Sequence, residues 1–286
     1  MAASLLDGKK VASLLHQDIQ LAVDSRIELG LRPPQLAVIL IGEDAPSQIY
    51  VENKRKACQE MGIQSLFYHL AFDIREYDLL SLISDLNENQ EVDGILVQLP
   101  LPPHIDSKTI IEHINPYKDV DGFHPYNFGR LAQGNPLLRP CTPYGIIRLL
   151  THYKLPLRGK NAVVVGASNI VGRPMALECL LAGSTVTICH RATRNLDEHI
   201  KNADIIIVAT GHHGVINTEW LNKNHIVVDV GIHRSKEGKL QGDIEFDRAK
   251  EIVAWLTPVP GGVGPMTIAT LLTNTLHAAE LNQQKK

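Results

Sequence analysis

Short runs of aliphatic residues alternate with helix-patterned segments along most of this chain of 286 residues. Residues 36–42 (LAVILIG) form one such run, and residues 204–209 (DIIIVA) form another. A continuous Leu, Val and Ile run of this length is typical of a strand that is buried on both faces of a parallel sheet. The alternation of such strands with helices predicts an α/β fold with parallel sheets.

The spacing of the apolar residues places the individual elements. In residues 7–29 they recur as on one face of a helix. We expect the other helices at residues 45–61, 76–86, 142–153 and 170–182, with a last helix from residue 264 or 265 to about 281. We expect the strands at residues 36–42, 65–70, 93–99, 161–166, 185–189, 204–209 and 225–231. Prolines crowd residues 100–143 and predict an ordered loop there.

The length of the chain is sufficient for two domains. Thr142 is a good N-cap and Pro143 suits the first turn of a helix, so we place the domain crossing there. We predict one α/β domain from residues 1–141 plus 267–286. Residues 142–266 form the second domain, which is Rossmann-like, and a cleft is expected between the two.

The charge balance and the apolar runs exclude several classes of protein. There are 28 basic and 31 acidic residues, a net charge of −3, which argues against a partner bound through nucleic-acid phosphates. The apolar run at residues 36–41 is far shorter than the ~20 residues of a membrane-spanning helix. The charged residues near the N-terminus fit neither a signal peptide nor a transit peptide, so we expect a cytoplasmic protein.

The cysteines and histidines show no metal-binding pattern. Four cysteines lie at positions 58, 141, 179 and 189, a spacing that matches no zinc or disulfide framework. We therefore expect all four to be buried, unreactive thiols in a reducing compartment. The 13 histidines form no HExxH or paired pattern, and we predict no metal site.

A glycine turn follows the predicted strand at residues 161–166. Gly166 ends the strand, and Gly172 opens the next helix. A glycine at such a turn lets a dinucleotide pyrophosphate approach the backbone, and the helix N-terminus offers free N–H groups to it. Ser168 stands where the usual motif has its second glycine, and its hydroxyl is suited to donate to a phosphate. The turn alone is a weak signal, since many strand–turn–helix units contain two glycines.

The end of the next strand favours NADP over NAD. Enzymes that bind NAD place an acidic residue there, about 20 positions after the glycine turn, to bind the ribose 2′-hydroxyl. Here the strand ends in His190 and Arg191, with Arg194 beyond them, and the first acid is Asp197. A guanidinium at this place favours a 2′-phosphate. The alternative is that Arg191 is an ordinary surface arginine.

Three polar residues share one face of the predicted helix at residues 45–61. Ser47, Tyr50 and Lys54 are spaced at i, i+3 and i+7. They are either capping and surface residues or an aromatic ring beside a functional amine. Gln98 ends the strand at residues 93–99, at the edge where ligands collect in α/β sheets. Asp121 lies in the proline-rich loop, and spacing alone does not assign it a role.

Six segments decide between these interpretations by their resemblance to a known family. The chain resembles the bifunctional methylenetetrahydrofolate dehydrogenase/methenyltetrahydrofolate cyclohydrolase family, in its short bacterial form, over essentially its whole length. The segments are YVENKRKA (50–57), DGILVQLPLPP (93–103), KDVDGF (118–123), PCTPYG (140–145), VGASNIVGRPM (165–175) and TPVPGGVGPMT (257–267).

The resemblance assigns roles to individual residues. It implies that Lys54 is the central catalytic residue, that Tyr50 stacks on the pterin, and that Gln98 and Asp121 contact the lysine and the pterin. It implies folate contacts for Ser47, Tyr50, Leu99, Pro100, Gly262 and Pro265. It implies NADP contacts for Gly166, Ala167, Ser168, Val171, Gly172, Arg191 and the backbone around Ile232.

The activity that the resemblance implies is oxidation of 5,10-methylenetetrahydrofolate with NADP, followed by hydrolysis to 10-formyltetrahydrofolate, in a homodimer. Three alternatives remain open at this point. The first is another two-domain NADP dehydrogenase such as shikimate dehydrogenase, and the second is a monofunctional dehydrogenase. The third is an NADP-binding sensor without activity, which would be expected to lack Lys54 or Gln98.

Overall fold

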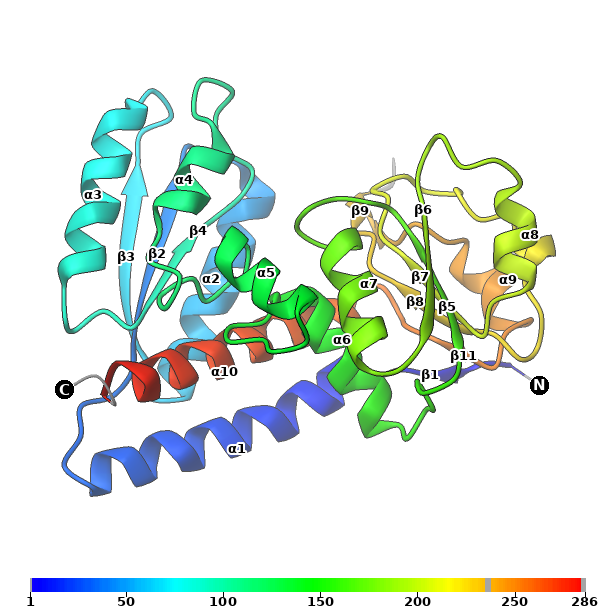
Figure 1. Cartoon of the computed structure of the whole chain (residues 1–286), viewed down its shortest axis with the longest axis horizontal. Coiled ribbons are helices and arrows are strands. Elements are labelled where there is room, and N and C mark those ends of the chain that lie inside the picture. The colour runs from blue at the N-terminus through cyan, green and yellow to red at the C-terminus, as the bar shows by residue number, and fades with distance from the viewer. Residues whose placement is uncertain (1, 235–237, 284–286) are drawn as a thin grey trace. The chain divides into compact units, whose positions relative to one another are not determined.

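The computed structural model describes residues 2–234 and 238–283. It divides into two compact units, each with its own parallel sheet (Figure 1). We call the part made of residues 14–141 and 268–283 the three-stranded unit, and the part made of residues 2–13 and 142–267 the six-stranded unit. The helices α1 (Gly8–Glu28) and α10 (Val263–Gln283) each contribute residues to both units.

The three-stranded unit has the strand order β3-β2-β4, and all of its strands are parallel. Its strands are β2 (Gln35–Ile41), β3 (Gln64–Leu70) and β4 (Gly94–Val97). The helix α2 (Ala45–Glu60) connects β2 to β3, and α3 (Glu76–Glu88) connects β3 to β4. The chain thus leaves β2 toward one side and returns on the other, so the carboxyl ends of β2 and β4 lie at a topological switch point.

Both faces of this sheet are covered, as the uninterrupted apolar run predicts. Alternate residues of β2 face opposite cores, because side chains of a strand alternate with a period of two. Leu36, Val38 and Leu40 pack with apolar side chains of α1, α2 and α10. Ala37, Ile39 and Ile41 pack with those of α3 and of α4 (Ser107–His113). The sheet is therefore the middle layer of three.

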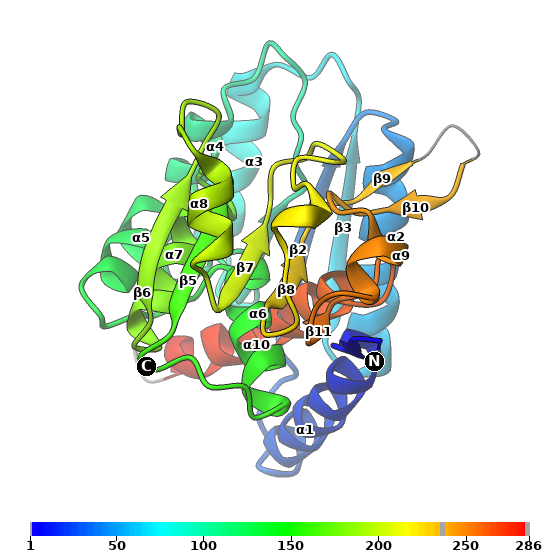
Figure 2. The same ribbon diagram turned by 90° about the vertical axis from the view of Figure 1, so that its right-hand side faces the viewer.

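The six-stranded unit has the order β1-β11-β8-β7-β5-β6, again parallel throughout (Figure 2). Its strands are β1 (Ser4–Leu5), β5 (Asn161–Val165), β6 (Thr185–Cys189), β7 (Ile205–Val208), β8 (Ile226–Asp229) and β11 (Trp255–Leu256). The helices α6 (Cys141–His152), α7 (Gly172–Leu181), α8 (Leu196–Lys201) and α9 (Phe246–Lys250) accompany them, with a 3-10 turn at Thr218–Trp220 and a hairpin of β9 (His233–Arg234) and β10 (Leu240–Gln241). The switch point lies between β5 and β7.

Two sequence predictions about the fold need correction. Residues 1–13 were assigned to the first domain, but residues 2–13 belong to the six-stranded unit because β1 pairs with β11. Residues 100–143 were predicted as loop, yet they contain α4 and α5 (Pro125–Ala132). These short helices start because the side chains of Asp106 and His124 accept backbone N–H groups at their first turns.

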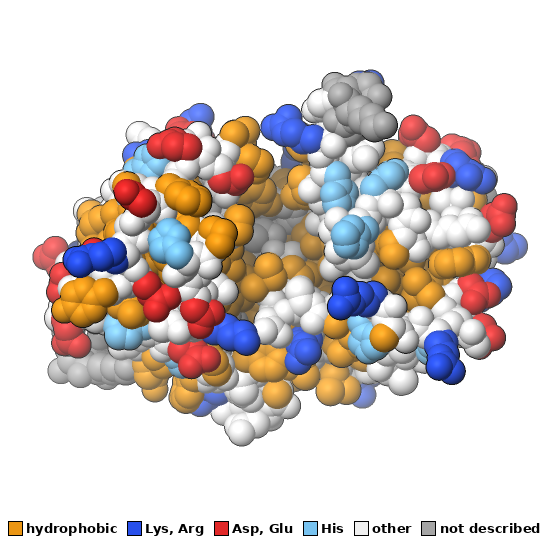
Figure 3. All heavy atoms as spheres, turned by 90° about the horizontal axis from the view of Figure 1, so that it is seen from above, with side chains coloured by type: hydrophobic (Ala, Val, Ile, Leu, Met, Phe, Trp, Pro, Cys, Tyr) orange, Lys and Arg blue, Asp and Glu red, His pale blue; other side chains and the backbone are white. Residues whose placement is uncertain are grey.

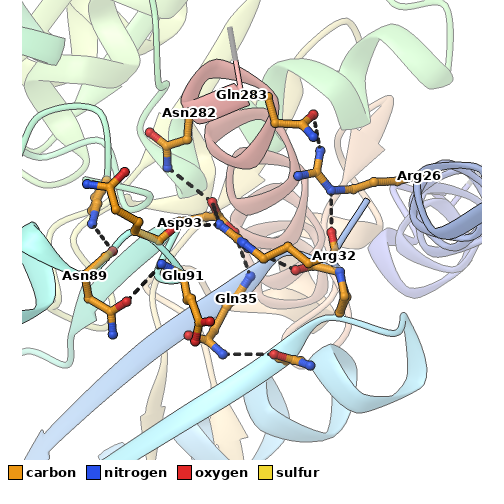
Figure 4. Close-up of polar contacts among 12 residues, drawn as sticks. Arg26, Arg32, Gln35, Asn89, Glu91, Asp93, Asn282 and Gln283 are labelled. Atoms are coloured by element: carbon orange, nitrogen blue, oxygen red, sulfur yellow. Dashed lines mark hydrogen bonds and ion pairs between the residues drawn. The ribbon is translucent and has the colours of Figure 1, made fainter. Parts of the chain in front are cut away.

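A buried carboxylate closes the amino-terminal edge of the three-stranded sheet (Figure 4). Asp93, just before β4, is completely buried. The guanidinium of Arg32 donates to both of its oxygens, at 2.6 and 2.8 Å. The backbone N–H of Gln35 at the start of β2 and the amide of Asn282 in α10 also donate to it. One carboxylate thus connects two strands and the last helix of this unit.

The Arg32–Asp93 pair predicts a large loss of stability on removal of the arginine. In Arg32→Ala the Asp93 carboxylate stays buried without its cation, so the free energy of unfolding should fall by about 3 kcal/mol. Urea unfolding followed by circular dichroism measures the change. The matched control is Arg75→Ala, whose pair with Asp78 is exposed on both sides and should leave the urea midpoint unchanged. Equal midpoints for the two variants would contradict this account of the pair.

Candidate active site and cofactor site

The helix α2 begins directly after β2 and carries the first predicted site residues. Asp44 is its N-cap, and Asp44 accepts both the backbone N–H and the hydroxyl of Ser47, at 3.0 and 2.6 Å. The hydroxyl and then the backbone N–H of Ser47 lower the pKa of Asp44, so the cap is ionised at neutral pH. Ser47 is buried, and the cap fixes the orientation of this helix against the sheet.

Lys54 lies farther along α2 on the same face and is buried, with 5% of its surface exposed. Its ammonium Nζ donates to Oε1 of Gln98 at 3.0 Å. Gln98 follows β4 directly, and its backbone N–H donates to the carbonyl of Ile39 in β2. The amide nitrogen of Gln98 donates to the carbonyl of Leu99 at 2.7 Å, which orients the amide with its oxygen toward Lys54. The structure therefore brings the predicted pair together.

The Tyr50 ring lies beside the same amine. Lys54 Nζ is 5.7 Å from the ring centroid, within the range of a cation–π contact. Burial raises the pKa of Tyr50, so the phenol stays neutral at physiological pH. Burial also raises the pKa of the neighbouring Cys58 thiol to about 12, which makes it unreactive. Of the nearby groups, Lys54 is thus the one that combines charge with a defined partner.

Asp121 faces the same lysine from the proline-rich loop. Burial raises the pKa of Asp121, and the positive charge of Lys54 partly offsets that shift. The backbone N–H of Cys141 donates to the Asp121 carbonyl, and its thiol donates to the Val120 carbonyl at 3.2 Å. Asn274 of α10 donates to that same carbonyl at 2.8 Å. Asp121 is therefore held on a braced loop in the three-stranded unit.

Lys118 and Asp119, which precede Asp121, are structural. The Lys118 ammonium donates to the carbonyls of Leu86, Asn87 and Asn89, so it caps the C-terminus of α3. The Asp119 carboxylate accepts from Asn127 and from two backbone N–H groups at residues 123 and 124. Among the described residues, no group of three or more His, Cys, Asp or Glu side chains is placed to hold a metal ion.

Gly166 makes the close turn after β5 that a dinucleotide site requires. Its φ is +124°, and a Cβ added there would lie 2.2 Å from the carbonyl oxygen of Ala209, after β7. A Cβ at Gly172 would lie 2.1 Å from the carbonyl oxygen of Gly166. The loop after β5 is thus folded tightly onto both the next helix and the neighbouring strand end. Only glycine fits at these two positions.

The segment between these glycines presents its backbone at the start of α7. The hydroxyl of Ser168 accepts the N–H groups of Val171 and Gly172, at 3.1 and 3.3 Å. Ser168 itself is exposed, and Ala167 and Val171 are half-buried. Ser168 therefore replaces the second glycine of the usual motif as a cap, and its lone pairs are shared with the helix N-terminus.

Arg191 is exposed in a tight turn after β6. The backbone N–H of His190 donates to the hydroxyl of Thr193, and the N–H of Ala192 donates to Nδ1 of His190. The first acid beyond the strand, Asp197, accepts from Lys201 at 2.7 Å within α8. The acid is therefore engaged elsewhere, and the arginine is the charged group presented by this turn.

The remaining predicted residues lie in two places. Leu99 and Pro100 follow Gln98 in the three-stranded unit and are joined by a cis peptide bond. Gly262, Pro265 and Ile232 belong to the six-stranded unit. Gly262 is buried, and a Cβ there would lie 2.7 Å from the Pro258 carbonyl oxygen. The Ile232 side chain is 50% exposed, just beyond β8.

The sequence did not indicate every residue that shapes these sites. Asp44 was missed, although Asp-Ala-Pro-Ser before a helix is a recognisable N-cap pattern. Asp229, Asp243 and Asn274 were also missed, and no local pattern announces them, because their partners are backbone groups distant in sequence. The four cysteines are buried, as expected from their spacing.

Two domain models of one protein family match the chain. The catalytic-domain model of the tetrahydrofolate dehydrogenase/cyclohydrolase family matches residues 6–121. The NAD(P)-binding-domain model of the same family matches residues 140–283. The chain is 58% identical over 279 residues to the bifunctional protein FolD of Legionella pneumophila (strain Paris), covering 98% of each.

Two solved structures show the same fold over nearly the whole chain. A bifunctional FolD methylenetetrahydrofolate dehydrogenase/cyclohydrolase from Campylobacter jejuni has a TM-score of 0.95 at 48% identity, covering 98% of this chain and 99% of the other. The methylenetetrahydrofolate dehydrogenase-cyclohydrolase of Trypanosoma brucei, solved with NADP cofactor and inhibitor, has a TM-score of 0.94 at 35% identity, covering 99% of each.

Proposed function

This chain belongs to the tetrahydrofolate dehydrogenase/cyclohydrolase family, and on that premise we propose that it catalyses two consecutive reactions. It oxidises 5,10-methylenetetrahydrofolate to 5,10-methenyltetrahydrofolate with NADP, and it hydrolyses that product to 10-formyltetrahydrofolate. The Lys54–Gln98 hydrogen bond beside Tyr50 carries the proposal, because it unites the polar groups that hydrolysis needs. The three-stranded unit binds the folate, and the six-stranded unit binds NADP.

The oxidation requires mainly that the folate and the dinucleotide be held in the correct positions. The cation that forms is delocalised over two nitrogens, so no strong base is needed. NADP, when bound, supplies the hydride acceptor. The chain's own task is to hold the dinucleotide on the Gly166–Gly172 turn and at the N-terminus of α7, and a side chain at either glycine would collide with the backbone and displace that turn. This turn is suited to a dinucleotide, and the exposed Arg191 after β6 supports NADP as the cofactor.

The hydrolysis asks for an activated water next to the methenyl carbon. Lys54 assists that water as a general base in its neutral form, or stabilises the developing negative charge in its ammonium form. Gln98 keeps the amine in place in both forms, since its amide oxygen accepts an N–H that the amine retains when it is neutral. We assign Lys54 as the catalytic residue and Gln98 as its positioning residue.

The pterin ring is the part of the substrate that Tyr50 and Asp121 recognise. A half-buried neutral phenol next to a cation offers a flat face for stacking. Asp121 is partly buried and braced through its backbone, so it is suited to hydrogen-bond the polar edge of the ring. Ser47 lies on α2 with Tyr50, and Leu99 and Pro100 follow Gln98 after β4.

Replacement of the lysine tests the hydrolytic role. In Lys54→Met, hydrolysis of 5,10-methenyltetrahydrofolate should fall by about 10²–10⁴-fold, the usual contribution of a proton-transferring group. The loss of its absorbance band, corrected for the spontaneous rate, measures this. The control is Lys56→Met on the exposed face of the same helix, which should keep the wild-type rate. Substantial hydrolysis by a folded Lys54→Met variant would remove Lys54 from the role.

Replacement of Arg191 tests the preference for NADP. If the guanidinium binds the 2′-phosphate, Arg191→Ala should weaken NADP by about 1–3 kcal/mol and leave the weaker binding of NAD almost unchanged. Titration with each dinucleotide measures both affinities. Arg248→Ala, an exposed arginine of α9 in the same unit, is the matched control. An equal effect of Arg191→Ala on NADP and NAD would identify Arg191 as a surface residue.

We also infer a cytoplasmic homodimer. The family resemblance supports a dimer formed through the nucleotide-binding unit, and a monomer mass in sedimentation at micromolar concentration would contradict it.

Four free, buried cysteines support a reducing compartment. No helix in the described ranges is long and apolar enough to cross a membrane. Acidic and basic side chains are interspersed on the face seen in Figure 3.

A further inference from the structure

A second buried carboxylate lies at the carboxyl edge of the six-stranded sheet, outside the residues assigned so far. Asp243 is completely buried. Its Oδ2 accepts the backbone N–H and the hydroxyl of Thr210, at 2.7 and 2.9 Å, and the N–H of Gly211 at 3.1 Å. Its Oδ1 lies 2.6 Å from Nε2 of His233. One side chain thus connects the turn after β7 to the segment after β8.

Asp229 at the end of β8 holds Asp243 in this position. Its carboxylate accepts the backbone N–H groups of Gly231, Asp243 and Ile244, at 2.9 to 3.0 Å. Burial raises the pKa of Asp229 to about 6, so at neutral pH the ionised form still prevails and accepts these bonds. The neighbouring Gly242 has no room for a side chain, because a Cβ there would lie 2.0 Å from Asp229 Oδ2.

The topology shows which part of the cofactor these segments face. The ends of β5, β7 and β8 are in register, with Val165 opposite Val208 and Val208 opposite Asp229. The dinucleotide pyrophosphate binds at the glycine turn after β5, and the adenosine ribose extends toward the strand on the β6 side. The nicotinamide half must therefore extend the other way, over the ends of β7 and β8.

We propose that Asp243 is a positioning residue for the nicotinamide half of NADP: it fixes the Thr210–Gly211 turn and, through His233, the backbone at residues 231–233. This inference rests on the proposed function and adds a residue to it. Asp243 does not contact the cofactor itself, because every oxygen of its carboxylate is buried and directed at the two segments. Its removal would leave the N–H groups of Thr210 and Gly211 without their acceptor, so the turn would have to move.

The proposal predicts a difference between two halves of the same ligand. Asp243→Ala should weaken NADP about tenfold or more. It should leave the affinity for adenosine 2′,5′-bisphosphate, which lacks the nicotinamide half, within about twofold of the wild type. Isothermal titration of the full-length chain with each ligand measures both. Arg191→Ala is the comparison variant, because it should weaken both ligands. Asp247→Ala, an acidic residue of α9, should weaken neither.

Each result decides the point. Loss of affinity for both ligands in Asp243→Ala, or for neither, overturns the proposal, since a general loosening of the unit does not distinguish the halves. If Asp243→Ala does not fold, as judged by its melting curve, Asp243→Asn decides instead. It keeps an acceptor oxygen and should show the same selective loss, smaller in size, whereas unchanged NADP affinity overturns the proposal. Absence of NADP binding or oxidation in the wild type would instead refute the proposed function itself.

Discussion

The hydrogen bond from Lys54 to Gln98 is the contact on which the proposed catalytic site of the three-stranded unit depends. A primary amine is costly to remove from water unless a partner replaces the lost hydrogen bonds. The partner here is an amide at the end of β4, and the amine comes from α2, which follows β2. Because β2 and β4 are adjacent and parallel, the helix that leaves one strand passes the end of the other. The switch point of the sheet thereby creates a place where a desolvated amine has a fixed partner.

In the six-stranded unit the proposed cofactor site is formed by backbone groups, and it also lies at a switch point of the sheet. Its switch point lies between β5 and β7, and there the packing leaves no space for a Cβ at Gly166 or Gly172. Close backbone packing exposes N–H groups at the start of α7 where an anion is stabilised. In both units a buried carboxylate joins separate segments of the chain through hydrogen bonds. Asp93 closes one edge of the smaller sheet, and Asp243 organises the ligand edge of the larger one.

The sequence predicted the strands that follow from local residue patterns and the site residues that lie in the long family motifs. Uninterrupted runs such as residues 36–42 and 204–209 are strands, because a strand buried on both faces needs apolar residues at every position. The predicted pairing of Lys54 with Gln98 is confirmed by their hydrogen bond, although spacing alone left Lys54 as one of several exposed-looking residues of a helix. The family motifs supplied the assignment that spacing did not.

The features that the sequence did not predict depend on partners that are distant in sequence. The strands β1 and β11 have two residues each, and they are defined by their pairing, since β1 pairs with β11 and β11 pairs with β8. Lys118 looked like part of a charged loop motif, yet its ammonium caps α3, whose last carbonyls lie about 30 residues away in sequence. The hydrogen-bond partners of Asp93 and Asp243 are likewise distant in sequence. Their roles follow from which strands meet, and that is decided by the whole fold.

The most direct test of the account is to add 5,10-methylenetetrahydrofolate and NADP to the purified chain and follow two absorbance bands, those of NADPH and of methenyl-folate. The account predicts that NADPH forms while methenyl-folate stays at or below the level set by its spontaneous hydrolysis. NADPH with accumulating methenyl-folate would contradict the assignment of Lys54 and leave a dehydrogenase alone. The absence of NADPH would contradict the central claim.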